Sequence, residues 1–415
     1  MTSEVIIINK FGLALAADSA VTVEHVHNYE RITKTYNSAN KLFSLSKHAP
    51  VGVMLYNTVT LGGLPLETVI KNYREQLGRR KFGRLSEYAD DFFGYLDGNS
   101  DLFPRQDTQF ITALHLMDEL LPILSSSTNK KDFKEKLEER VEEIESLDRI
   151  ECLSDSQIAS EVRASRSLLD DISNHIFRDR KSYATGTKSL VQKLYKTMFS
   201  RKYKTSGYTG LVFAGFGERD FLPSLSHYYV DCIFADKVRR WEIEEHSLSN
   251  TSQGQVIPLA DSEVMETLLN GMNPQYEKEA NSQTLTVLAK SIQTIIEQLP
   301  HADEAEKEKL KKASIKALIA GLDSYREAMK DYKDQHYSRP IRQAIAALPI
   351  AELGSVAETL INVSHIHKRV NPQFETVGGP VDVAVISKGD GFVWVKRKHY
   401  FDASINPTFA LKYLG

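Results

Sequence analysis

The sequence of 415 residues predicts a mixed α+β protein, built as a four-layer αββα sandwich with two helical insertions. Strand-like segments come in three groups, near the start, the middle and the end of the chain. Charge-rich segments with helical spacing separate these groups. The last strands can be buried only if they join the first ones. Two sheets with helices outside each are therefore the simplest arrangement that gives one core.

The first sixty residues are predicted to form two hairpins. The run EVIIINKFGLALAADSAV contains two apolar strands around a turn at residues 10–12. The segment NKLFSLSKHAPVGVMLYN repeats this format, with a strand over residues 41–46, a turn around Pro50 and a strand that ends at Tyr56. Apolar residues at helical spacing follow in LPLETVIKNYREQLG and RLSEYADDFFGYLD.

The remaining segments complete the predicted organisation. The chain ends in a hairpin with its turn at residues 388–391. We expect a core whose first part spans residues 2–104, a helical insertion over 105–204, central core strands over 205–262, a second helical insertion over 263–350, and a last helix with the closing hairpin over 351–415.

Composition and charge exclude several classes of protein. A formal net charge of -3 provides no basic field for nucleic acid or anionic lipid. The two cysteines, Cys152 and Cys232, lie in unrelated contexts, which argues against a disulfide framework and favours a reducing compartment. No secretory leader is visible, and no apolar run approaches the roughly 18 residues that span a bilayer. We therefore expect a cytoplasmic protein with neither a nucleic-acid nor a membrane partner.

Three residues near the start of the chain, Thr2, Asp18 and Lys41, suggest a shared chemistry. Removal of Met1 would give Thr2 a free α-amine beside its hydroxyl, and such an amine can act as the base that activates a threonine nucleophile. Its unperturbed pKa of about 7.7–8.0 suits proton transfer near neutral pH. Lys41 would stabilise the alkoxide, and Asp18, at the end of the second strand, would orient Lys41. Taken singly, each residue is more typical of a structural role.

The opening TSEVIIINKFGLALAADSAVT resembles the start of mature proteasome β-subunits and their bacterial relatives, the HslV and Anbu peptidases. These are N-terminal nucleophile (Ntn) hydrolases. Their pattern begins at a catalytic Thr and continues with G-V-x-x-A-A-D-S/T-R and K-[LV]-x-x-[IL]. On this pattern Thr2 matches the nucleophile, Asp18 the aspartate, and Lys41 in NKLFSL the lysine. Further similar segments, covering about half of the chain in all, are VGVMLYN, TGLVFAGFG and AELGSVAETLINVSHIHKRVNPQFETVGGPVDVAVISKGDG.

The resemblance also assigns accessory positions and shows departures. Where the family's oxyanion strand carries a glycine, this chain has Tyr56 or Asn57, whose backbone N–H can still donate. The family's accessory serine corresponds to Ser262, with the neighbouring Asp261 as the alternative. The family's second aspartate and the serine before its glycine pair have no counterpart in QFETVGG.

The resemblance implies a threonine peptidase or amidohydrolase that cleaves peptide or protein substrates. It also implies a homo-oligomer and an ATP-dependent unfoldase as partner, and it implies no cofactor. Two alternatives stay open: a catalytically inactive interaction or scaffold protein on the same fold, and an Ntn transpeptidase.

Two His-x-His pairs are the remaining candidates for a metal site. His25 and His27 lie in a polar, loop-like stretch, and His365 and His367 lie at the end of a predicted helix. Two histidines on one strand face can begin a metal site. Because neither pair has a third ligand nearby in the sequence, we predict no metal.

Overall fold

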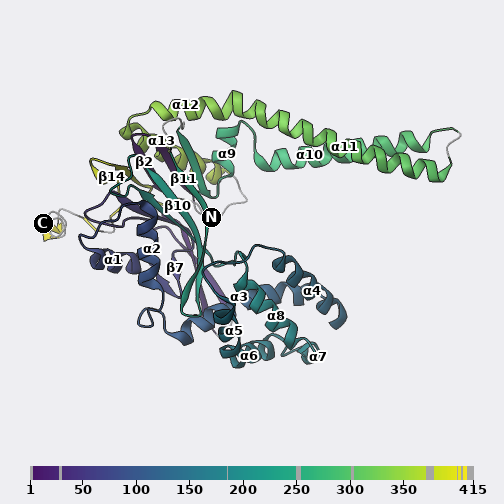
Figure 1. Ribbon diagram of the computed structural model, residues 1–415, viewed down its shortest axis with the longest axis horizontal. Helices are drawn as coiled ribbons and strands as arrows, with labels where there is room; N and C mark the ends of the chain where they lie inside the picture. The colour runs from purple at the N-terminus through teal and green to yellow at the C-terminus, as the bar shows by residue number, and fades with distance from the viewer. Residues whose placement is uncertain are drawn as a thin grey trace.

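The computed structural model describes residues 3–27, 30–184, 186–248, 254–300, 303–370, 378–399, 401–402 and 405–408. In this part of the chain the protein is mixed α+β, with two five-stranded antiparallel sheets and helices that come between their strands in sequence. Figure 1 shows the sheets at the centre, with helices on either side. The predicted α+β class is confirmed.

The first sheet joins the two ends of the chain. Its hydrogen-bonded order is β12 (Gln255–Ala260), β1 (Ser3–Asn9), β2 (Gly12–Ala17), β13 (Asp382–Ser387) and β14 (Gly391–Lys396). Both strands of the first hairpin are buried along their whole length, as their apolar sequences require. The prediction that the last strands join the first is confirmed, because Val383 pairs with Ala16.

The second sheet is assembled from the other strand groups. Its order is β11 (Lys237–Ser247), β10 (Ser224–Phe234), β9 (Thr209–Gly215), β6 (Val51–Asn57) and β5 (Leu42–Ser44). The predicted hairpin around Pro50 is therefore present as β5 and β6. Its first strand is shorter than the sequence suggested, because Ser46 accepts hydrogen bonds from the N–H groups of His48 and Ala49 and forms a turn.

Strand alternation places the two sheets against each other. Ile6 of β1 packs with Met54 of β6 in the core between the sheets, whereas the alternate residue Val5 packs with Leu353 on the opposite face. That opposite face is covered by α13 (Ile350–Val370). The outer face of the second sheet, which includes Val53, packs on α1 (Leu66–Leu77) and α2 (Leu85–Leu96).

Two helical segments lie outside these layers. The first has its own core of apolar side chains, which also takes in Cys232 and Phe234 at the end of β10. The same helices turn their mixed charges to solvent, as an amphipathic helix does. They are α3 (Arg105–Ser126), α4 (Lys130–Glu145), α5 (Asp155–Ala164), α6 (Arg166–Ile176), α7 (Lys181–Ala184) and α8 (Lys188–Ser200).

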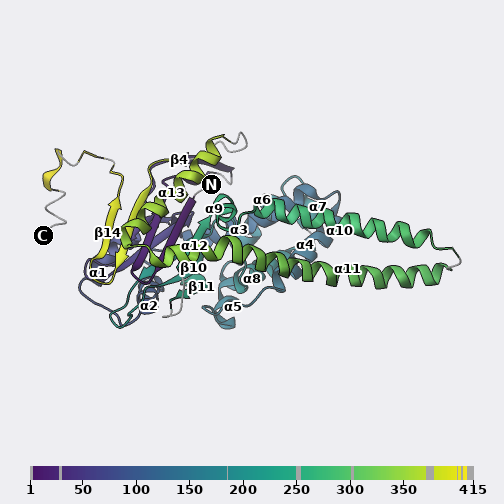
Figure 2. The same ribbon diagram turned by 90° about the horizontal axis from the view of Figure 1, so that it is seen from above.

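The second helical segment forms a projecting arm. Figures 1 and 2 show α10 (Pro274–Glu297) and α11 (Glu304–Lys333) running side by side away from the sheets. In the described part of these two helices only Ile296 and Leu322 are buried, and Ile295 is 63% exposed. The arm is connected to the sheets through α9 (Glu263–Asn270), the π-helix η1 (Asp334–Ser338) and α12 (Arg339–Ala347).

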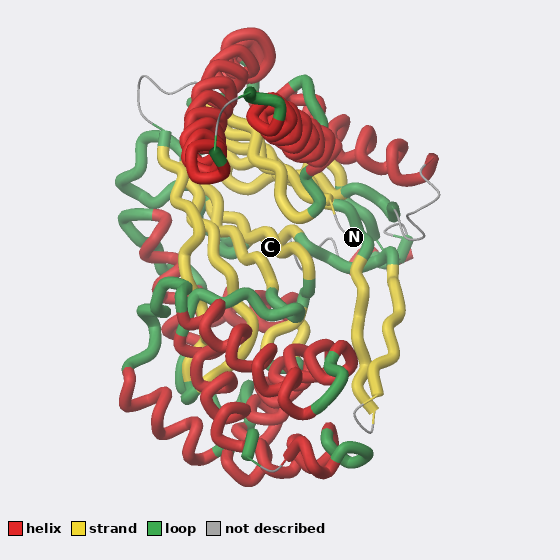
Figure 3. Tube along the Cα trace, turned by 90° about the vertical axis from the view of Figure 1, so that its right-hand side faces the viewer, coloured by secondary structure: helices red, strands yellow, loops and turns green. Residues whose placement is uncertain are grey.

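One pair of strands differs from the expectation. The stretch that reads as a polar loop around His25 and His27 forms β3 (Val21–His27), which pairs with β4 (Glu30–Tyr36) as a separate two-stranded sheet. Figure 3 shows this hairpin standing apart from the larger sheets, at the right. A shorter pair, β7 (Thr60–Leu61) and β8 (Leu64–Pro65), precedes α1. No helix in the described residues is both long and apolar enough to cross a membrane.

Close packing between β6 and β9 leads to a first prediction. Gly210 lies opposite Tyr56, and a Cβ atom added to Gly210 would overlap the Tyr56 ring. We expect Gly210→Ala to lower the free energy of unfolding by about 1–3 kcal/mol in urea denaturation, because both partners are held in sheets. Gly321→Ala is the matched control: its Cβ meets nothing within 4 Å in α11, so it should raise stability by up to about 1 kcal/mol. Equal effects of the two changes would contradict the close packing at Gly210.

Candidate active site

The first sheet brings together the start of β1 and the ends of β2 and β12. We call this side of the sheet, which runs across the strand ends, an edge. Asp18 directly follows β2, and its backbone N–H donates to the carbonyl of Ser3, the first residue of β1, at 3.1 Å. Ser3 is also paired with Ala260, the last residue of β12, so Asp261 lies at the same edge. This is the consequence of antiparallel pairing, in which one strand ends where its neighbour begins.

Lys41 reaches this edge from the second sheet. It stands directly before β5, and its carbonyl accepts a hydrogen bond from the N–H of Leu55 at 2.8 Å. Its Nζ lies 2.5 Å from Oδ1 of Asp18 and 2.8 Å from Oε1 of Glu4. All three side chains are buried. A buried ammonium is tolerated because two carboxylates replace its hydration.

The last turns of α13 complete the cluster from the helical layer. His365 and Lys368 are three residues apart and therefore share a face of the helix. Nε2 of His365 lies 3.6 Å from Oδ2 of Asp18. Nζ of Lys368 donates to Oγ of Ser3 at 2.8 Å and lies 2.9 Å from Oδ2 of Asp261. We call Glu4, Asp18, Lys41 and His365 the lysine cluster.

The electrostatics of the lysine cluster favour an ionised Asp18. Burial by itself raises the pKa of this carboxyl. The nearby His365 side chain and the charge and hydrogen bond of Lys41 act in the opposite direction, and they leave the pKa of Asp18 lowered from its ordinary value. Asp18 is therefore a carboxylate at neutral pH and holds Lys41 by charge as well as by hydrogen bonding.

A tyrosine and a histidine lie in the core between the sheets. The Tyr56 hydroxyl is 2.6 Å from Nε2 of His227. Burial lowers the pKa of His227 to about 4, helped by the charges of His246 and Lys204, so the ring that shares this hydrogen bond with Tyr56 is neutral near pH 7. Burial also raises the pKa of Tyr56, and its ring is 3% exposed. The side chain is held in the core and not at the surface.

Asn57, the next residue, has an unusual backbone conformation. Its φ of 67° lies in the left-handed region that favours glycine, and asparagine is among the side chains that tolerate this region best. Its Nδ2 donates to the carbonyl of Tyr208 at 2.7 Å, which fixes the side chain.

The structure brings together some of the residues singled out by sequence and separates others. Asp18 and Lys41 are in contact, whereas Thr2 lies outside the described residues. The Ser262 hydroxyl donates to Glu266 of its own helix. It is the neighbouring Asp261 that joins the edge, through Lys368.

Sequence reasoning missed Glu4 and Lys368, and it considered His365 only as a candidate metal ligand. Glu4 carried a signal, because it is the only charged residue in the strand that runs over residues 3–9. The other two could have been found only by asking which helix covers the strand ends. The side chains of His25 and His27 lie outside the described residues. His365 is buried against Asp18 and His367 is exposed, so this pair does not share a face. No group of metal-ligating side chains occurs in the described part of the chain.

Comparison with known proteins adds no relative. No protein-family model matches the chain, and a search of curated proteins finds no match. The geometry of the lysine cluster and the sequence resemblance therefore carry the functional argument.

Removing the ammonium from the lysine cluster should be costly. Lys41→Met leaves Asp18 and Glu4 as adjacent buried carboxylates, and we expect the free energy of unfolding to fall by about 3–5 kcal/mol in urea denaturation. The triple variant Glu4→Gln/Asp18→Asn/Lys41→Met, which removes the charges together, should recover much of this loss. Lys47→Met breaks an exposed pair with Glu75 and should cost less than about 1 kcal/mol. A triple variant less stable than Lys41→Met would contradict the charge argument.

The buried His227 should make the fold sensitive to acid. Its folded-state pKa of about 4 is below the value near 6.5 of an unfolded chain, so the unfolded state binds more protons as pH falls through 6.5. The contribution of neutral His227 to the free energy of unfolding is therefore fully present above pH 6.5. About 2 kcal/mol of it should be lost between pH 7.5 and pH 5.0. The urea midpoint should therefore fall more between pH 7.5 and pH 5.0 for the wild type than for His227→Gln. Equal falls would show that His227 does not titrate in this way.

Proposed function

We propose that the protein is an Ntn-type threonine peptidase or amidohydrolase whose nucleophile is Thr2, exposed by removal of Met1. The observation that carries the proposal is the buried Lys41, held by Asp18 and Glu4 at the edge where β1 begins. Thr2 is one peptide bond from Ser3, the residue whose carbonyl accepts from Asp18. The succession of helices, sheet, sheet and helices in the apolar cores supports a four-layer sandwich of the Ntn kind.

The proposed reaction uses the chain's own groups. Oγ of Thr2 forms a bond to the substrate carbonyl carbon while the α-amine of Thr2 takes the hydroxyl proton. The proton passes to the leaving amine as the C–N bond breaks, which leaves an ester on Thr2. Water then attacks the ester, gives up a proton to the same amine and releases the acid. Lys41 supplies positive charge that favours the alkoxide, and Asp18 and Glu4 hold that charge in place.

Asn57 is the better counterpart of the family's oxyanion glycine. Its positive φ is a conformation that glycine adopts without strain, whereas Tyr56 has its ring buried against His227. We propose the backbone N–H of Asn57 as the donor to the developing oxyanion. This choice removes the conflict between a bulky tyrosine and an incoming substrate.

Lys368 and Glu4 are proposed as positioning residues. Lys368 ties the Ser3 side chain to Asp261, and Glu4 shares the Lys41 ammonium with Asp18. Lys368 holds Ser3, the residue after Thr2, and Glu4 is the next residue in the chain, so these contacts fix the backbone that directly follows Thr2. The motif residues that the chain shares with the family do not include either of them.

The partners implied by the resemblance are kept as proposals: a peptide or protein substrate, a homo-oligomer and an ATP-dependent unfoldase. One observation favours the second candidate function, an inactive interaction or scaffold protein. The arm of α10 and α11 exposes large apolar side chains, including Tyr276, Ile295 and Tyr325, that a partner could cover. Light scattering on the purified protein distinguishes a monomer from a homo-oligomer.

The decisive experiment is intact mass spectrometry of the native protein before and after treatment with a threonine-reactive epoxyketone or β-lactone. We expect Met1 to be absent and one probe molecule to be bound. Thr2→Ala should bind none. Thr2→Ser, which keeps the hydroxyl and the amine, should still react. The peptide products made with and without an added amine acceptor then separate hydrolysis from transpeptidation.

Lys41→Arg tests the role of the ammonium in the same assay. The change keeps the charge but not the compact geometry between two carboxylates, so labelling should slow at least tenfold while the protein stays folded by circular dichroism. A folded wild-type protein that retains Met1 and binds no probe would overturn the hydrolase proposal. The inactive interaction or scaffold protein would then be the remaining candidate.

A further inference from the structure

A large pocket lies at the opposite edge of the sheets from the lysine cluster. Its volume is about 960 Å³, and it is lined by the β5–β6 turn, the α1–α2 connection, the residues after β9 and the β13–β14 turn. β2 separates the two edges: Asp18 follows its last residue, and its other end is paired beside Ile386, next to the β13–β14 turn. Six residues of strand correspond to about 20 Å. The pocket is therefore a separate site.

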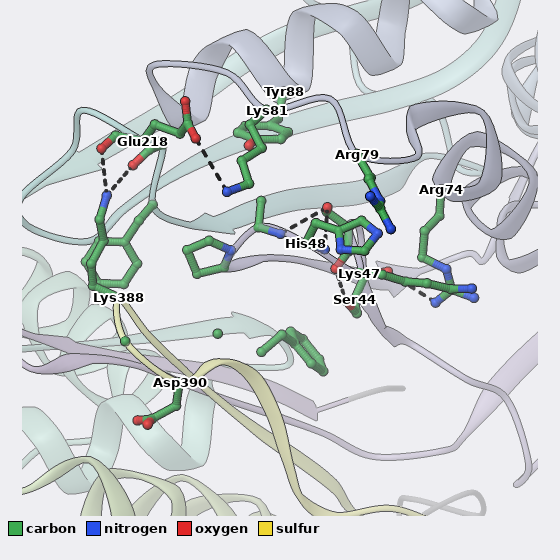
Figure 4. A pocket seen from close by; sticks show the side chains of 18 of the residues that line it. Ser44, Lys47, His48, Arg74, Arg79, Lys81, Tyr88, Glu218, Lys388 and Asp390 are labelled. Carbon is green, nitrogen blue, oxygen red and sulfur yellow. Dashed lines mark hydrogen bonds and ion pairs between the residues drawn. The ribbon is translucent and has the colours of Figure 1, made fainter. Parts of the chain in front are cut away.

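The pocket lining is strongly basic. Its lysine and arginine side chains outnumber its two carboxylates, Glu218 and Asp390, and they come from three separate segments of the chain. Figure 4 shows His48, Arg74 and Arg79 at one side of the pocket. The lysines and arginines are Lys47, Arg74, Arg79, Lys81, Lys388 and Arg397.

Several of these cations lack a full set of partners. Arg79 makes no hydrogen bond and no ion pair with any described residue. Nε of Arg74 is buried without a hydrogen-bond partner, and its Nη1 makes one long bond of 3.4 Å to the Ser44 carbonyl. Lys81 is 3.5 Å from Glu218, a distance beyond a good hydrogen bond. Guanidinium groups with unused donors are suited to an anion.

Lys388 connects two walls of the pocket. Nζ of Lys388 donates to the carbonyls of Gly217, Glu218 and Asp220, at 2.6, 3.0 and 2.9 Å, and so joins the β13–β14 turn to the loop after β9. Its charge is not cancelled by a carboxylate, although its three donors are used. The pocket thus keeps its positive charge without depending on a ligand for its shape.

An aromatic surface completes the lining. Trp394 and Phe392 pack edge to face with ring centroids 5.1 Å apart, and both are partly exposed. The Arg397 guanidinium lies 4.5 Å from the centroid of the Trp394 ring. A flat ring could stack here while its charged groups reach the arginines. The volume is at the upper end of the range for small-molecule sites, about 300–1,000 Å³.

We propose that this basic pocket binds a small molecule that carries several phosphate groups and a flat ring, the class to which nucleoside triphosphates belong. A concentrated set of cations from three segments fits a compact polyanion better than an extended acidic peptide, which would need charges spread along a groove. Arginine also matches phosphate oxygens in a bidentate fork. The proposal does not rest on the peptidase proposal, because the pocket shares no residue with the lysine cluster.

Tryptophan fluorescence tests the proposal in the full chain. The protein has two tryptophans, so Trp241→Phe leaves Trp394 in the pocket as the sole reporter. We expect ATP and inorganic triphosphate, each titrated without added metal, to change the Trp394 signal with saturation. ATP should bind more tightly because its ring adds stacking. Isothermal titration calorimetry on the wild type measures the same binding without a mutation.

Two neighbouring arginines give a matched pair of variants. Arg79→Ala removes a cation from the pocket and should weaken ATP binding about tenfold, as expected for a bond to a charged group. Arg80→Ala removes the next charge in the chain, which pairs with Asp91 outside the pocket, and should change binding less than about twofold. Equal losses in the two variants, or no saturable binding of either phosphate compound, would overturn the proposal. So would tighter binding of citrate or of a glutamate-rich peptide.

Discussion

The ion pair of Lys41 with Asp18 and Glu4 is the interaction on which the edge of the core depends. Glu4 and Asp18 belong to the first sheet, whereas Lys41 leads into the second. The three side chains are buried, so their charges hold the sheets together where apolar packing ends. Such a cluster is costly to desolvate and adds little net stability compared with apolar residues. Its presence in a core therefore fits the role proposed for Lys41 at that edge.

The two helical segments lie outside the layered core and are stabilised in different ways. The segment over 105–200 builds its own core and joins the sheets through β10. The arm of α10 and α11 does the opposite: its two helices contact each other but bury few side chains. A pair of helices cannot enclose a core by itself, which leaves apolar residues exposed along its length. The sheets thus keep a regular layering while the additions differ in how they are stabilised.

The two edges of the sheets differ in electrostatic character. At one edge, carboxylates and ammonium groups are buried and matched, as in the contacts of Asp18 with Lys41 and of Asp261 with Lys368. At the other, Arg74 and Arg79 face a pocket with donors unused. Matched buried charges fix positions, whereas unmatched charges at a cavity attract a ligand. The two proposed sites therefore lie at opposite ends of β2, about 20 Å apart, and differ in their electrostatics.

Much of the fold could be predicted because its elements have strong local signals. The run from Val5 to Ala17 is apolar on both sides of a turn, and that alone indicates a buried hairpin. The hairpin of β3 and β4 was missed because its sequence is polar, and pairing between strands is decided by the partner as much as by the strand.

For the candidate site, the sequence by itself determined the residue types and the return of Asp18 to the start of β1, because a hairpin's geometry follows from its turn. It also singled out Lys41. Only the tertiary structure decided that Glu4 shares Lys41, and that His365 and Lys368 come from α13 to meet Asp18 and Ser3. The same holds for the basic pocket, whose lysines and arginines come from three segments far apart in the sequence. Contacts between residues hundreds of positions apart arise from packing of whole layers, and no local pattern records them.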